Sequence, residues 1–453
     1  MSTDFRRALG PWSAAALIAG SMIGTGIFFF VADVAARLPS RGGILAAWGV
    51  GAVIAACGAL SLAELAAAYP ETGGIYVFLH RAFGPAVAFL YAWAKFLIMR
   101  PGSFAILAIA FASFSLQLFG AAADAHPWLA RGIAIGAVVV LTAVNTVGVC
   151  AGAGVQNVLT AAKVLAVVAV IGVGAAYALG ALEAHAVAIK PRAAEDGFLP
   201  LLFGAALIPV MWTYGGWDEA PFVAEEIRDP GRNLPLAIVG GVAGVALLFV
   251  LVNAAYLAIL SPSEMAATGG RTATVAMERA LGDGARGALS VALMVSTFGA
   301  ANGLALTGGR IVYATGRGQA LFRWFAHTHP RTKTPLRGLV AQCLLTIAAL
   351  VLFANPFQLL LYTGLAYWAF AGLTAAAVFV LRRRDPDRER PFRVWGYPFT
   401  PALFVLASLG MAVSVAVTSP DKARVTVGIL AGGAVVWAIQ ALAFRNRLSA
   451  SDS

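Results

Sequence analysis

Two glycine-containing interruptions of long apolar stretches are the first features of this sequence that could do chemistry. Gly24, Thr25 and Gly26 lie near the middle of one stretch, and Gly215 and Gly216 interrupt another. Each glycine lowers helix propensity by about 1 kcal/mol relative to alanine. Backbone that leaves a helix at membrane depth is tolerated where it lines a cavity. Glycines also simply allow helices to pack closely, but two interruptions in corresponding positions favour a cavity between discontinuous helices.

The peptide groups at such interruptions suit a small zwitterion. The N-terminus of a half-helix carries partial positive charge, so we expect the N–H groups around Thr25 to bind a carboxylate. Freed carbonyl groups of Met22 and near Trp212 would hold the ammonium group. This arrangement would bind the part that all α-amino acids share, and nearby side chains would select among them. The candidate substrate-binding residues are Met22, Gly24, Thr25, Gly26, Ser103, Trp212, Thr213, Gly215, Asp218, Phe298 and Asn302.

Lys163 is the most informative single residue, because it lies deep in an apolar stretch. An ionised lysine there costs about 2.5 to 3.5 kcal/mol even on a lenient insertion scale. We predict that its ammonium group takes the place of a coupling cation and bonds carbonyl groups freed at the first interruption. The alternative is that Lys163 lies nearer the membrane surface and extends its side chain to the interface.

Other charges also lie within apolar stretches. Arg100 precedes Pro101, and we expect it to pair with a carboxylate or with carbonyl groups at a proline kink. Asp218 could hold the substrate ammonium, select a cationic side chain, or pair within the protein. A further group is expected to form a surface salt-bridge network; its members are Glu225, Glu226, Arg228, Asp229 and Arg232.

The elements that must position these residues follow from composition. The 453 residues are 60% hydrophobic and 12% charged, with a mean hydropathy of +0.82, which excludes a large soluble enzyme. A membrane span takes about 20 apolar residues. Twelve stretches qualify, at 11–36, 43–69, 84–118, 128–147, 153–180, 198–225, 234–260, 286–313, 336–354, 356–381, 396–417 and 424–444. We therefore predict an all-α membrane protein that forms a single domain over 1–453.

The spacing of the interruptions predicts internal symmetry. The first and sixth stretches are the interrupted ones, which is typical of a five-plus-five inverted repeat. The repeats would cover about 11–180 and 198–381, and two peripheral helices would cover about 396–444. No cleavable signal is expected, since the first apolar stretch has no small-residue cleavage site and many spans follow it.

The charge of +11 reflects orientation in the bilayer more than a polyanionic partner. Lysine and arginine are most numerous in connectors on the side of both termini, so the termini are predicted to be cytoplasmic. No cationic face for nucleic acid is expected. His327 and His329 lack the carboxylate or cysteine neighbours of a metal site, and the sequence contains no GxxxxGK[ST] loop for nucleotide hydrolysis. We predict no metal and no cofactor.

Seven motifs run through nearly the whole chain in order: GSMIGTGIF (20–28), LAELAAAYPETGGIYVFL (62–79), MRPGSFAILAIAFASF (99–114), VQNVLTAAKVLA (155–166), YGGWDEAPFVAEEIRDPGRNLPLAI (214–238), STFGAANGLALTGGRIVYATGR (296–317) and RPFRVWGYP (390–398). Together they resemble the amino acid, polyamine and organocation transporter superfamily, and they best fit its L-type amino acid transporter branch with bacterial relatives. The resemblance implies a LeuT-like fold and sodium-independent transport of amino acids by alternating access. It places the carboxylate site at Gly24, Thr25 and Gly26, an aromatic gate at Trp212, a cation-replacing lysine at Lys163 and a polar position at Asn302.

The sequence departs from that branch in three places. Thr25 stands where serine is common, and Asp218 stands where a neutral polar residue is frequent. The connector around Gly120 to Trp128 contains no cysteine, so a disulfide-linked ancillary subunit is not expected. We predict an inner-membrane exchanger of neutral L-amino acids. The alternatives are a proton-coupled symporter in which Lys163 titrates, a transporter of cationic amino acids or polyamines, and a sensor or channel.

Overall fold

A computed structural model describes residues 9–24, 26–121, 125–193, 195, 197–353 and 356–451. Within these ranges the chain is helical, and the only strand-like pairing is an isolated parallel bridge between Leu9 and Ile227. Eleven helical segments are long and apolar enough to cross a membrane. The predicted stretch at 336–354 corresponds to a shorter apolar helix, Leu336–Leu352.

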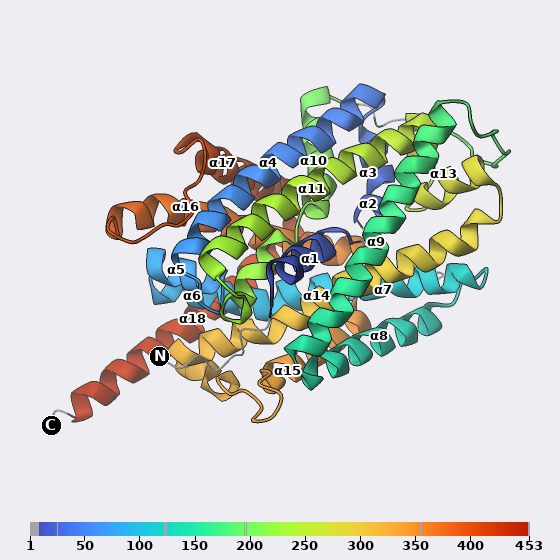
Figure 1. The fold of residues 1–453 in the computed structure, drawn as a ribbon. Coiled ribbons are helices and arrows are strands. Elements are labelled where there is room, and N and C mark those ends of the chain that lie inside the picture. Colours follow the sequence, from blue (N-terminus) through green and yellow to red (C-terminus); the bar gives the residue numbers. More distant parts are fainter. Residues whose placement is uncertain are drawn as a thin grey trace.

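Figure 1 shows the helices as one bundle. Their bounds are α1 (Pro11–Met22), α2 (Gly26–Phe29), α3 (Val31–Arg37), α4 (Arg41–Ala68), α5 (Ile75–Phe83), α6 (Pro85–Ala94), η1 (Lys95–Met99, a π-helical turn), α7 (Arg100–Leu118), α8 (Pro127–Val147), α9 (Val149–Ala178), α10 (Leu199–Thr213), η2 (Trp217–Glu226, a 3-10 helix), α11 (Pro230–Ile259), α12 (Pro262–Ala267), α13 (Thr272–Leu281), α14 (Ala285–Gly318), η3 (Ala320–Phe325, a 3-10 helix), α15 (Leu336–Leu352), α16 (Pro356–Arg384), α17 (Phe399–Thr418) and α18 (Pro420–Ser451).

Proline and glycine set many of the helix boundaries. Pro11, Pro85, Pro127 and Pro230 each lie in the first turn of a helix, where the missing N–H would have had no intrahelical partner. Gly148 separates α8 from α9 at a φ of 149°, a conformation that side chains disfavour. Local sequence therefore explains much of where the spans begin.

The short helix α1 is surrounded by the rest of the bundle. It contacts α9, α11, α14 and η2, and Figure 1 shows it in the midst of these helices. On one side, Trp48, Tyr214 and Phe249 pack as an aromatic cluster that joins α4, α10 and α11. The Tyr214 hydroxyl donates to the carbonyl of Trp48 at 3.0 Å, so the chain is tied to α4 directly after the last residue of α10.

Candidate functional site

The chain leaves helical geometry between α1 and α2. Helix α1 ends at Met22, and α2 begins at Gly26. The N–H of Gly24 donates to the Met22 carbonyl at 2.8 Å, so two groups that we expected to be available to a ligand bond each other here. Thr25, the predicted centre of the carboxylate site, lies outside the described residues.

The second interruption lies directly against the first. Helix α10 ends at Thr213, and Gly216, with a φ of 101°, precedes η2. A Cβ atom on Gly216 would stand 2.9 Å from the carbonyl oxygen of Ser21. A Cβ atom on Gly26 would stand 2.2 Å from the Thr213 hydroxyl oxygen. Glycine at both positions therefore permits the two interrupted segments to touch.

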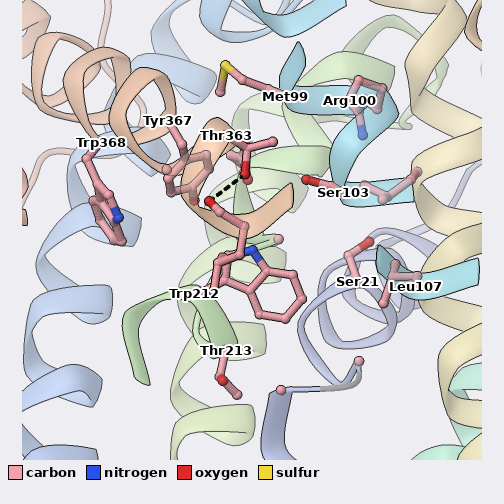
Figure 2. Close-up of a pocket in the computed structure, with 18 of the residues that line it drawn as sticks. Ser21, Met99, Arg100, Ser103, Leu107, Trp212, Thr213, Thr363, Tyr367 and Trp368 are labelled. Carbon is pink, nitrogen blue, oxygen red and sulfur yellow. Dashed lines mark hydrogen bonds between the residues drawn. The ribbon is translucent and has the colours of Figure 1, made fainter. Parts of the chain in front are cut away.

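A cavity opens where these segments meet (Figure 2). Most of the predicted substrate-binding residues line it, namely Met22, Gly24, Gly26, Ser103, Trp212, Thr213, Gly215 and Asp218. The indole of Trp212 packs edge-to-face on Phe30, with ring centroids 5.2 Å apart. The carbonyl of Trp212, predicted to face an ammonium group, accepts the N–H of Gly215 at 3.0 Å.

Two predicted lining residues do not reach the cavity. Phe298 packs on Phe111, with ring centroids 5.2 Å apart. Asn302 accepts a hydrogen bond from Asn145 at 2.9 Å and donates to Gln156 at 2.9 Å. Asn302 ties α14 to α8 and α9 through its side-chain amide. Neither residue is among those that line the cavity, and a role for them at the substrate stays a prediction.

Lys163 is fully buried and joins α9 to the end of α1. Its Nζ donates to the carbonyl oxygens of Gly20 at 2.5 Å and Ile23 at 2.9 Å. Ser296 also donates to Ile23, at 3.2 Å. The lysine is absent from the cavity lining. It thus contacts the backbone behind the cavity wall, from the side opposite the open space.

Two buried ion pairs form part of the cavity wall. Lys95 Nζ lies 3.1 Å from Asp218 Oδ2, and Arg100 Nη1 lies 2.8 Å from Glu219 Oε2. The Thr307 hydroxyl also donates to Glu219 Oε2. Buried charges are costly unless paired, so the pairs explain how four ionised groups are tolerated here. Of the roles left open for Asp218, the structure shows pairing within the protein.

Several residues that line the cavity carry no obvious signal in the sequence. They include Ser21, Met99, Leu107, Thr363, Tyr367 and Trp368, all of which are labelled in Figure 2. The Ser21 hydroxyl is buried and has no partner among the described residues. Glu219 could have been suspected, because two cations in the third span require two anions elsewhere at membrane depth.

The expected surface network around Glu226 is wrong in one respect. Glu226 is fully buried, and its carboxylate is bound by Arg310 through Nε at 2.5 Å and Nη2 at 3.1 Å. The reason is that Glu226 is the last residue of η2, whose side chains are almost all buried, whereas Arg228 and Asp229 further along are exposed. The Glu226 carbonyl also accepts the N–H of Leu9 at 2.9 Å. This pair is a buried element of the fold.

The helices and the cavity at two touching interruptions define a multi-pass membrane protein with a solute-sized internal site. A family model described as amino acid permease matches residues 9–439, and the chain belongs to this family. This confirms the resemblance to the amino acid, polyamine and organocation transporter superfamily.

Known relatives are transporters. The chain is 31% identical to the b(0,+)-type amino acid transporter 1 of Mus musculus, over 92% of this chain and 84% of that protein. It is 33% identical to the large neutral amino acids transporter small subunit 2 of Rattus norvegicus, over 86% of this chain and 72% of that protein. The serine/threonine exchanger SteT of Bacillus subtilis (strain 168) is 28% identical over 95% of this chain and 96% of that protein.

Proposed function

We propose that this protein is a sodium-independent exchanger of neutral L-amino acids that works by alternating access. The observation that carries the proposal is the position of Lys163, whose ammonium group binds the Gly20 and Ile23 carbonyl oxygens at the end of α1. Carbonyl oxygens are the ligands that a sodium ion would take at an unwound helix. A fixed ammonium group at these oxygens removes the need for a bound ion.

The substrate's shared atoms are assigned to the two interrupted segments. The carboxylate would bind at Gly24 to Gly26, near the start of α2, and the ammonium group would bind carbonyls at the end of α10. Trp212 would cover the bound substrate. The names of the relatives support amino acids as the solute class. In this proposal the hydrogen bond from the Gly24 N–H to the Met22 carbonyl is present without substrate and breaks when substrate binds.

The pairing of Asp218 with Lys95 supports neutral over cationic substrates, because the carboxylate is already neutralised at 3.1 Å. We further propose a LeuT-like arrangement of one membrane domain, with repeats at 11–180 and 198–381 and peripheral helices α17 and α18. The membrane would be the inner membrane, with cytoplasmic termini and no disulfide-linked subunit.

Counterflow in reconstituted vesicles tests the function. Vesicles are loaded with an unlabelled neutral amino acid, and uptake of the same labelled amino acid is followed with sodium replaced by choline. We expect uptake to require the unlabelled amino acid inside the vesicles and to proceed at the same rate in sodium and in choline. Equal uptake into empty vesicles driven by an inward proton gradient would instead establish proton symport. A gradient-driven leak without trans-stimulation would establish a channel.

A further inference from the structure

Arg100 lies at the start of α7 on the side of that helix that faces the cavity. Ser103 and Leu107 follow at intervals of three and four residues, and all three line the cavity. Residues at this spacing share one face of a helix. Figure 2 shows Met99 and Arg100 towards one end of the lining and Thr213 towards the other. Arg100 is therefore placed to meet a substrate side chain rather than the α-carbon groups.

The guanidinium group of Arg100 is only partly used by the protein. Its Nη1 donates to Glu219 Oε2 at 2.8 Å. Its Nε and Nη2 atoms are buried and have no hydrogen-bond partner among the described residues. A buried donor on a charged group that makes no hydrogen bond is costly, so these donors point to a ligand acceptor.

Two other arginines, the buried Arg310 and the partly exposed Arg382, show which acceptors the Nε and Nη2 edge of a guanidinium group binds in the same protein. Arg310 binds Glu226 through Nε and Nη2, at 2.5 and 3.1 Å. Arg382 binds Glu64 through the same two atoms, at 2.8 and 2.6 Å. The Nε and Nη2 donors are parallel and match planar oxygen acceptors. For these two atoms of Arg100, the described residues supply no such acceptor.

The charges nearby decide what kind of acceptor fits. Lys95 with Asp218 and Arg100 with Glu219 make the wall neutral overall. A substrate carboxylate at Arg100 would lie beside the Glu219 carboxylate, and like charges at that range repel strongly in a dry site. A neutral carbonyl oxygen avoids this repulsion. Both hydrogen bonds made to Glu219 by the described side chains end on Oε2, so Oε1 can accept from a ligand N–H.

A carboxamide has both features, an oxygen that accepts and an NH₂ that donates. We propose that Arg100, with Glu219 beside it, binds the side-chain carboxamide of the substrate, so that asparagine-like and glutamine-like amino acids are preferred. The inference rests on the proposed function and adds the substrate class. Glu219 also acts as a positioning residue, since it holds Nη1 while Thr307 holds Glu219.

Three amino acids of nearly equal shape test this assignment. Leucine, asparagine and aspartate share their branching and differ in the terminal group. Each is used to inhibit trans-stimulated uptake of labelled alanine by the wild-type protein in vesicles. We expect asparagine to inhibit about tenfold or more tightly than either of the others, the effect of hydrogen bonds to a charged group. Equal or tighter inhibition by leucine, or by aspartate, overturns the proposal.

Variants separate a substrate contact from a structural role. The double variant R100M/E219Q keeps the wall neutral and replaces both the guanidinium group and the carboxylate. In this variant asparagine and leucine should inhibit alanine uptake about equally tightly, because asparagine inhibition weakens more than leucine inhibition. R100K keeps the charge but loses the parallel donors, and it should lose most of the preference. Equal weakening of all three inhibitors would assign Arg100 a structural role only and overturn the proposal.

The matched control is R424Q, because Arg424 is exposed and pairs with the exposed Asp421. It should keep the wild-type ratio. Thermal shifts of the purified protein with each of the three amino acids give a readout that does not need transport. Alanine exchange without an asparagine preference rejects this inference and leaves the proposed function intact. Absence of exchange rejects the proposed function, and the thermal shifts then decide whether asparagine is preferred.

Discussion

Lys163 donates from the middle of α9 to the carbonyl oxygen of Ile23, one residue beyond the end of α1, at 2.9 Å. The two residues are 140 positions apart in the chain. The contact fixes the place where α1 stops, because a carbonyl that has lost its helical partner gains an ammonium donor. A change at Lys163 should therefore alter the geometry of the cavity wall without touching the cavity itself.

The variant K163A tests this coupling. We expect amino acid exchange to fall by at least about tenfold, because the hydrogen bonds from a charged donor to Gly20 and Ile23 are lost. Exchange is measured in vesicles, and folding is checked by size-exclusion chromatography and thermal unfolding. K190A, at an exposed lysine of the connector before α10, is the control. Wild-type exchange rates in K163A would show that this lysine does not organise the site.

Replacing the ion tests the same residue in a different way. The wild-type protein should exchange amino acids at equal rates in sodium and in choline, since the ammonium group already occupies the carbonyl oxygens of Gly20 and Ile23. Initial rates over a series of sodium concentrations measure this. A strict sodium requirement would mean that an ion binds elsewhere at the interruption, and the assigned role of Lys163 would have to be abandoned.

The buried pair of Glu226 and Arg310 should matter for stability. E226A removes the carboxylate that binds Arg310 through two hydrogen bonds, and breaking a buried ion pair typically costs about 3 to 5 kcal/mol. D421A removes one partner of an exposed pair, which is worth about 1 kcal/mol or less. Thermal unfolding in detergent should rank E226A far below D421A. If both variants unfold at the wild-type temperature, the carboxylate of Glu226 is not the main partner that stabilises Arg310.

Local features of the sequence predict the interruptions and the buried lysine. Glycine lowers helix propensity wherever it stands, and a lysine within an apolar stretch needs partners whatever the fold. The glycines at 24, 26, 215 and 216 and the lysine at 163 required no knowledge of neighbouring helices. What they bind does require such knowledge, which is why the carboxylate and ammonium sites stay predictions.

The partners of the intramembrane charges could not be read from the sequence. Arg100 and Glu219 are 119 positions apart, and their pairing depends on where the fold places the start of α7 relative to η2. The lining residue on α14 shows the same limit. Leu304 reaches the cavity, whereas Asn302, two residues earlier, points to α8 and α9. Side chains two positions apart on a helix point in nearly opposite directions. The orientation of α14 about its own axis therefore had to be known.

Gly216 offers a test of the contact between the two interrupted segments. Its φ of 101° is disfavoured for residues with a Cβ atom, and that atom would lie 2.9 Å from the Ser21 carbonyl oxygen. G216A should therefore force η2 away from the end of α1 and carry backbone strain of about 1 to 3 kcal/mol. We expect exchange to be lost and the unfolding temperature to fall.

The matched control for G216A is G244A. Gly244 lies in α11, and a Cβ atom there would meet nothing within 4 Å. Alanine favours the helix by about 1 kcal/mol, so G244A should exchange amino acids at the wild-type rate and unfold at the same or a slightly higher temperature. Exchange at the wild-type rate by G216A would show that the close approach of the two segments is dispensable. If exchange is lost in G216A but not in G244A, transport depends on the backbone contact at Ser21, because both variants add the same methyl group.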